Sequence, residues 1–238
     1  MKALGVIGGL GPMATAYFLQ LLTQMTHAET DQQHIEVLIH SKPQIPDRTR
    51  FILGKSTQNP VPDMVEVGCA LGRQGAELLA IPCITAHYFQ KELEEAIGLP
   101  IINALEETAA YLEIRGFQKI GIMATDGTIE SGIFQQVLEA HDMEVAVPGA
   151  AGQAKVMHLI YENVKAGKPL EYDLFEEVAK ELFDSGAQVI LLGCTELSMI
   201  KKEFLLKPGF LDVMEVLARK AVLSCGSLKE EYEELITQ

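Results

Sequence analysis

Basic residues are scarce in this sequence. Of its 238 residues, 19 are Lys or Arg and 33 are Asp or Glu, which gives a formal net charge of -14 at pH 7. No run of Lys or Arg forms a patch that can follow a phosphate backbone. We therefore expect no nucleic-acid partner.

Long apolar runs are also lacking. No stretch approaches the roughly 20 residues that cross a bilayer. The N-terminus carries one Lys and then a strand-like run, rather than a secretory signal. Nearly half of the residues, 48%, are nevertheless apolar, which is enough for a substantial core. These features predict a cytoplasmic protein with no membrane partner.

Cysteine occurs only four times, and several familiar motifs are missing. Without a secretory signal, four cysteines are expected to be reduced rather than paired in disulfides. No CxxC or HxxxH spacing appears, so the sequence predicts no metal site. The GxSxG elbow is absent too, which leaves serine hydrolysis without support.

Apolar, β-branched runs alternate with stretches of helical periodicity. The runs have Gly or Pro near their ends and are typical of buried parallel strands. The alternation predicts an α/β fold. The expected strands cover residues 3–8, 35–39, 78–81, 119–124 and 188–192. The expected helices cover residues 13–27, 85–97, 104–115, 129–141, 153–166 and 174–185.

The chain also looks duplicated. LLAIPCITAH at 78–87 has a counterpart in VILLGCTEL at 189–197, and GVIGGLGP has one in IGIMATDGT at a similar separation. Repeats of this kind indicate repeated structural units. We predict two pseudo-symmetric α/β domains, each a small, mostly parallel sheet flanked by helices, with the active site in the cleft between them.

The predicted first domain covers residues 1–103 and 212–238, and the second covers 104–211. The last segments, at 212–224 and 228–236, have helical patterns and no third repeat of the strand and turn. We expect them to pack back on the first half.

Cys83 and Cys194 lie at equivalent points of the repeat, each in a turn after a strand. Open α/β sheets bind ligands at this end of their strands. Two facing halves would place one cysteine on either side of a shared cleft. A helix start lowers the pKa of a cysteine, so a thiolate and a thiol can serve as base and acid for proton transfer at a carbon atom.

Packing is the alternative for each cysteine, because unpaired Cys is among the most buried residue types. Cys69 and Cys225 lie within helical patterns and are assigned to packing. His87 is one turn from Cys83, where it can activate the thiol or simply pack.

The turn around Gly9 and Gly11 follows a strand and precedes a helix, so its backbone N–H groups can hold an anion. A dinucleotide site would need glycine where Ala14 stands, and Pro12 removes one donor. A carboxylate fits this turn better. A tight turn that merely needs glycine is equally compatible with the sequence.

Four further side chains can supply charge or hydrogen bonds. Arg48 lies in a polar loop and can hold a carboxylate, or pair locally with Asp47. Lys165, near a helix end, can add positive charge or remain solvated. Thr125 and Thr128 offer hydroxyl groups at a helix start, where Thr128 can equally serve as a cap.

With these residues identified, the sequence resembles the aspartate/glutamate racemase family, and within it the aspartate racemase branch. The resemblance covers most of the chain. It is carried by GVIGGLGPMAT, SKPQIPDRT, IPCITAH, ATDGTIESG, IYENVKAG and LLGCTEL, in the family's order and spacing.

The resemblance implies a racemase that interconverts L- and D-aspartate by two-base proton transfer at the α-carbon, with no cofactor. Cys83 and Cys194 would be the bases. Arg48 would bind the side-chain carboxylate of the substrate with help from Lys165. The glycine turn, Thr85, Thr125 and Thr195 would line the pocket. The partner would be a small acidic amino acid, and we expect a homodimer.

One position departs from the family pattern. Ile84 stands where PCNTAH has Asn, and losing a hydrogen bond to a charged group costs about 1.5–3 kcal/mol. Two alternatives therefore stay open. The chain can be a protein that binds an amino acid or dicarboxylate with lost or altered catalysis, or an enzyme resembling maleate isomerase.

Overall fold

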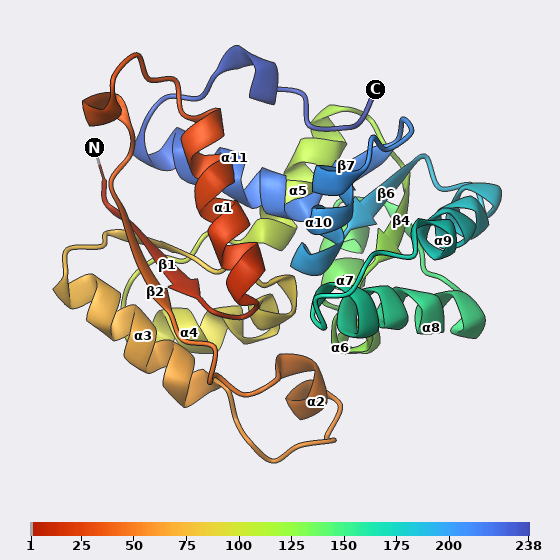
Figure 1. The fold of residues 1–238 in the computed structure, drawn as a ribbon, viewed down its shortest axis with the longest axis horizontal. Coiled ribbons are helices and arrows are strands. Elements are labelled where there is room, and N and C mark those ends of the chain that lie inside the picture. Colours follow the sequence, from red (N-terminus) through yellow and green to blue (C-terminus); the bar gives the residue numbers. More distant parts are fainter. Residues whose placement is uncertain (1) are drawn as a thin grey trace.

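The computed structural model describes residues 2–238, which form two parallel β-sheets flanked by helices (Figure 1). Strand order is β2-β1-β3 in the first sheet and β5-β4-β6-β7 in the second. The first sheet contains β1 (Leu4–Gly8), β2 (Val37–Ser41) and β3 (Leu78–Ala80). The second contains β4 (Lys119–Met123), β5 (Glu144–Ala146), β6 (Val189–Leu192) and β7 (Phe210–Asp212). The predicted α/β class is confirmed.

The sequence repeat corresponds to a repeated strand pairing. In the first sheet, β3 pairs with β1, and in the second, β6 pairs with β4. Both pairs are parallel, and every residue of these four strands is buried except Lys119, which is half-buried. At its carboxyl end, β3 leads into the turn that contains Cys83, and β6 leads into the turn that contains Cys194.

Helices cover both sheets. Those in the first part of the chain are α1 (Pro12–Met25), α2 (Arg48–Ile52), α3 (Val61–Arg73) and α4 (Gln90–Ile97), with 3-10 turns η1 (Asp31–Gln33) and η2 (Ile84–Phe89). The later ones are α5 (Ala104–Ile114), α6 (Asp126–Ser131), α7 (Ile133–Ala140), α8 (Ala150–His158), α9 (Tyr172–Asp184), α10 (Thr195–Glu203) and α11 (Val213–Cys225). A π-helical turn, η3 (Leu159–Val164), continues α8, and a 3-10 turn, η4 (Glu230–Tyr232), follows α11.

One cluster of buried apolar side chains connects the two sheets. It runs from Leu4 on β1 through α1, α5 and α11 to Leu191 on β6. Helix α11 packs against both α1 and α5 in the middle of the molecule (Figure 1). The two halves therefore share a core, and the division into domains at residues 103 and 212 stays a prediction.

Some elements differ from the expectations. Strands β5 and β7 were not predicted, because each is short and includes an acidic residue, Glu144 or Asp212, so neither forms an apolar run. The helix expected over 129–141 is interrupted at Gly132, whose φ of 68° ends α6. The helix expected over 153–166 changes to π-helical geometry after His158.

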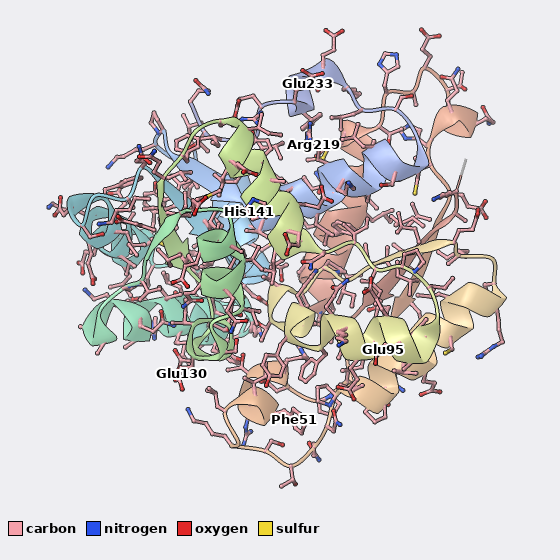
Figure 2. All side chains as sticks on the ribbon, turned by 180° about the vertical axis from the view of Figure 1, so that it is seen from behind. Phe51, Glu95, Glu130, His141, Arg219 and Glu233 are labelled. Atoms are coloured by element: carbon pink, nitrogen blue, oxygen red, sulfur yellow. The ribbon has the colours of Figure 1, made fainter. Side chains whose placement is uncertain are left out.

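The helix expected over 228–236 is wrong, since only the turn η4 forms there. The backbone of this segment finds partners elsewhere: the N–H of Leu235 donates to the hydroxyl of Tyr111, and that of Thr237 donates to the carbonyl of Phe210. Seen from behind, acidic side chains such as Glu95, Glu130 and Glu233 project from the surface, in line with the net charge (Figure 2).

The glycine turn between β1 and α1 is built around Gly9. Its φ is 91°, and its N–H donates to the hydroxyl of Thr15 at 2.9 Å. A Cβ atom on Gly9 would lie 2.5 Å from the backbone of Lys42 and 2.7 Å from that of Pro43. Close approach of two backbone segments therefore requires glycine here, and this N–H already has a partner within the turn.

We expect Gly9→Ala to lower the free energy of unfolding by about 2–5 kcal/mol, because it combines a left-handed φ with a backbone clash. Gly54→Ala is the matched control: its φ is 66°, but no neighbouring atom lies within 4 Å. The control should lose only about 1–2 kcal/mol. Urea unfolding of both variants measures the difference, and equal losses would contradict the role of the close approach.

Candidate active site

Both predicted cysteines line the same narrow cavity. Cys83 follows β3 and precedes η2, and Cys194 follows β6 and precedes α10. Each residue is 6% exposed. The cavity offers only about 10 Å³, roughly the room of one water molecule. We call it the cysteine cavity. A substrate carbon can be placed between Cys83 and Cys194 only if the walls of this cavity separate slightly.

Arg48 begins α2 and is buried beside Cys83, rather than lying in an exposed loop. Its guanidinium donates to the carbonyl oxygens of Leu10 and Pro46, both at 3.0 Å, and of Ile45 at 3.3 Å. Burial opposes the charge on Arg48, but Cys83 and then Asp47 outweigh it and raise the pKa of Arg48. A fixed positive charge therefore lies beside the first cysteine.

Cys194 has the opposite surroundings. Its Sγ donates to Oε2 of Glu196 at 2.9 Å. Burial raises the pKa of Cys194 well above its ordinary value, and the Glu196 carboxylate raises it further, while Lys165 partly offsets both. The lowered pKa expected from the helix start is wrong for this cysteine, because burial and a neighbouring anion outweigh the helix. Cys194 is a thiol at neutral pH.

Lys165 follows the turn η3, and its Nζ lies 3.8 Å from Oε1 of Glu196 and 4.4 Å from the centre of the Tyr161 ring. Burial lowers the pKa of Lys165, but Glu196 and Cys194 outweigh burial and raise it to about 12. Lys165 therefore keeps its charge at neutral pH, and its pKa responds to both cysteines.

Four threonine hydroxyls form a cluster across the two halves. Thr49 donates to Thr125 at 3.2 Å, and Thr85 lies 3.0 Å from both Thr125 and Thr128. Thr49, Thr85 and Thr125 line the cysteine cavity, whereas Thr128 is fully buried behind them. Thr195 lines the same cavity from the start of α10.

Helix α10 is anchored at its far side. Ser198 donates to the buried Asp212 at 2.7 Å, and Lys201 donates to Glu215 at 2.6 Å. Burial and then Asp212 raise the pKa of Glu215 to about 7. These contacts attach α10 to β7 and α11, and so hold the turn that carries Cys194.

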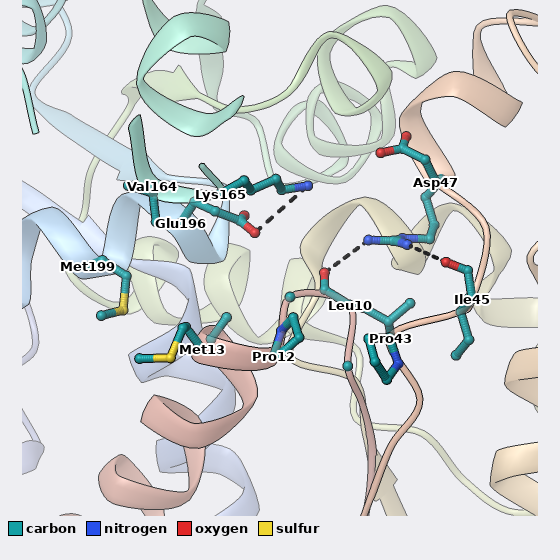
Figure 3. A pocket seen from close by; sticks show the side chains of 14 residues that line it. Leu10, Pro12, Met13, Pro43, Ile45, Asp47, Val164, Lys165, Glu196 and Met199 are labelled. Carbon is teal, nitrogen blue, oxygen red and sulfur yellow. Dashed lines mark hydrogen bonds and ion pairs between the residues drawn. The ribbon is translucent and has the colours of Figure 1, made fainter. Parts of the chain in front are cut away.

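A wider cavity of about 500 Å³ adjoins the cysteine cavity (Figure 3). We call it the vestibule. Gly9 and Gly11 line the vestibule and not the cysteine cavity. The two cavities share five lining residues: Leu10, Asp47, Arg48, Lys165 and Glu196.

Six residues that line the cysteine cavity were not among the predicted site residues: Leu10, Asp47, Thr49, Ile84, Tyr161 and Glu196. Glu196 is the most important, and its place directly after the Cys-Thr pair of the second turn was the available signal. Tyr161 donates to Oδ2 of Asp47 at 3.2 Å, which connects η3 to α2 across the site. No sequence pattern connects these two residues, because the contact depends on the packing of the halves.

Two residues next to the site, His87 and Asp126, have contacts of their own. His87 is buried, and its Nδ1 lies 3.2 Å from the carbonyl oxygens of Cys83 and Ile84, so it contacts the turn and not the thiol. Burial lowers the pKa of His87. Asp126 accepts from the amide of Gln153 at 2.8 Å and pairs with no cation among residues 2–238.

Within the described part of the chain, no group of three or more His, Cys, Asp or Glu side chains could hold a metal ion. A membrane-crossing helix is likewise not found over residues 2–238.

Comparison with known proteins gives a consistent result. Residues 7–221 match the family model described as Asp/Glu/Hydantoin racemase. The solved structure of Picrophilus torridus aspartate racemase is similar over 98% of both chains, with a TM-score of 0.83 and 30% sequence identity. The Bacillus subtilis (strain 168) broad specificity amino-acid racemase RacX is 25% identical over 92% of this chain and 96% of its own length.

Glutamate racemase from Francisella tularensis shares the fold, with a TM-score of 0.66 and 18% identity over 94% of this chain and 80% of its own. The family match covers most of the sequence and includes both cysteine turns, whose side chains share one cavity. The chain belongs to the Asp/Glu/hydantoin racemase family.

Proposed function

We propose that this chain racemises amino acids, aspartate among them, by proton transfer between Cys83 and Cys194 without a cofactor. One observation carries the proposal: two cysteines line one cavity, one beside a guanidinium and the other bonded to a carboxylate. Racemisation needs a base on one face of the α-carbon and an acid on the other. The guanidinium beside Cys83 favours the role of base, and the carboxylate bonded to Cys194 favours the role of acid.

The proposed step begins with Cys83 as a thiolate and Cys194 as a thiol. The Cys83 sulfur takes the α-proton, and the electron pair of the broken C–H bond moves toward the substrate carboxylate. Cys194 then gives its proton to the opposite face and becomes the thiolate. A thiolate beside the Glu196 carboxylate is unfavourable, so the pair tends to return to its starting protonation state.

Support for an acidic substrate comes from the two cations. Arg48 and Lys165 lie at the junction of the two cavities, where a carboxylate can reach them. Picrophilus torridus aspartate racemase, at 30% identity, has the same overall fold. The Bacillus relative is described as a broad-specificity racemase, so the test must cover several amino acids.

Ile84 favours a second candidate, a protein that binds an amino acid without racemising it. Ile84 lines the cysteine cavity, and its buried apolar side chain offers no hydrogen bond to a substrate. Incubation with L-aspartate in deuterated water separates the candidates. A racemase incorporates deuterium at the α-carbon and forms D-aspartate, whereas a binding protein does neither.

We expect Cys83→Ala and Cys194→Ala each to reduce the formation of D-aspartate from L-aspartate by at least about 10²-fold, because each removes one of the two proton-transfer groups. Cys69→Ala is the control, since Cys69 is half-buried on α3 and outside the cavity. Polarimetry gives the rates. Wild-type racemisation in either of the first two variants would contradict the two-base mechanism.

Glu196→Gln should lower the pKa of Cys194, because it removes the negative charge that raises it. Racemisation that needs Cys194 as a thiol is present below this pKa and is lost as pH rises through it. The alkaline limb of the pH–rate profile should therefore move to lower pH. The pH dependence of Cys194 alkylation, followed by mass spectrometry, should move in the same direction.

Glu203→Gln is the matched control, since it makes the same charge change at the exposed end of α10. It should leave both profiles in place. An alkaline limb that moves upward or stays fixed in Glu196→Gln would show that Glu196 does not govern the protonation of Cys194.

Lys165→Met should reduce kcat/KM for L-aspartate by about 10²-fold, because the charge that faces the developing negative carboxylate is lost. Lys168→Met removes an exposed lysine after the same turn and should change kcat/KM by less than about twofold. Steady-state polarimetry measures both. Equal effects of the two substitutions would argue against a specific role for Lys165.

A further inference from the structure

The vestibule is larger than aspartate requires. It holds about 500 Å³ beside a cysteine cavity of only about 10 Å³. Pockets for small ligands generally span about 300–1,000 Å³ and enclose most of the ligand. The side chain of aspartate has a single CH₂ group and a carboxylate, and it would leave most of this space unfilled.

The charged residues occupy one part of this space. Two cations, Arg48 and Lys165, and two carboxylates, Asp47 and Glu196, lie where the cavities meet. An amino acid carries both an ammonium and a carboxylate on its backbone, so this junction matches both charges of a zwitterion. Its α-carbon would then lie at the cysteine cavity.

The remaining wall of the vestibule is largely apolar. Besides backbone at the glycine turn, it presents thioether, proline ring and branched aliphatic groups (Figure 3). Methionine side chains adapt to ligands of different shape and are common at surfaces that bind several partners. The apolar lining comprises Leu10, Pro12, Met13, Ala14, Pro43, Ile45, Val164 and Met199.

Available space determines the direction of a bound side chain. Ile84, Thr85 and Thr125 line the cysteine cavity, whose volume of about 10 Å³ leaves no room for further groups. The vestibule shares five lining residues with the cysteine cavity and offers this space past the junction. A long apolar side chain would cross the junction and contact Met13 and Met199.

We propose, on the basis of the racemase function above, that the substrates include neutral amino acids with extended apolar side chains, such as methionine, and that the vestibule is the side-chain subsite. Met13 and Met199 determine this part of the specificity. The apolar side chain of the substrate leaves water and contacts the apolar wall of the vestibule. This burial favours substrates with longer side chains than that of alanine.

The test compares L-methionine, L-alanine and L-aspartate in deuterated water. We expect kcat/KM for α-deuteration of methionine to exceed that of alanine by about tenfold or more, since a few buried methylene-sized groups account for such a ratio. Met13→Glu should lower the methionine-to-alanine ratio by about tenfold, because it places a carboxylate on the apolar wall. Met13 is 65% exposed at the start of α1, so the substitution is compatible with folding.

Leu19→Glu is the matched control. Leu19 is an exposed apolar residue of the same helix, 41% accessible, and does not line the vestibule. This variant should keep the wild-type ratio. Exchange of aspartate or alanine without exchange of methionine would overturn the inference and leave the racemase function intact. A ratio that Met13→Glu does not change would also overturn it.

A chain that exchanges none of these amino acids would contradict the racemase function itself. Calorimetric titration then tests the subsite separately. The subsite is supported if methionine binds about tenfold more tightly than alanine, and if this preference is reduced in Met13→Glu and kept in Leu19→Glu. Equal binding of the two amino acids overturns it.

Discussion

The carboxylate of Glu196 is the group on which the electrostatics of the site depend. One of its oxygens accepts from the Cys194 thiol, and the other lies 3.8 Å from the Lys165 ammonium. A buried carboxylate such as Glu196 is costly unless it is paired with a cation. Glu196 and Lys165 therefore stabilise one another. Burial and the Glu196 carboxylate keep the proton on Cys194, while Lys165 partly opposes them.

The two halves repeat a backbone arrangement but differ in charge. Each half places a cysteine after a buried strand that pairs with the first strand of its own repeat. The neighbour of Cys83 is a guanidinium, whereas that of Cys194 is a carboxylate. A symmetric scaffold thus positions two equivalent cysteines, and their nearest charged neighbours have opposite sign.

Much of this arrangement could be predicted from the sequence. The repeat, the buried strands and the polar turns placed Cys83 and Cys194 at corresponding positions, because strand ends of parallel sheets meet at one edge. The direction in which the pKa of Cys194 is shifted could not be predicted, since the shift depends on burial and on Glu196. The contact between Tyr161 and Asp47 joins residues far apart in the chain, and only tertiary packing creates it.

The shared core has a consequence for how ligands reach the thiols. Because α1, α5 and α11 tie the sheets into one cluster of side chains, a swing of one half against the other would expose apolar surface. Helix α2 is only five residues long and contacts the second half through hydroxyl and carboxylate groups, at Thr49 and Asp47. Each such hydrogen bond contributes about 0.5–1.5 kcal/mol, far less than a core of many apolar side chains. Widening the cysteine cavity at α2 would therefore disturb less apolar packing than a displacement of one whole half against the other.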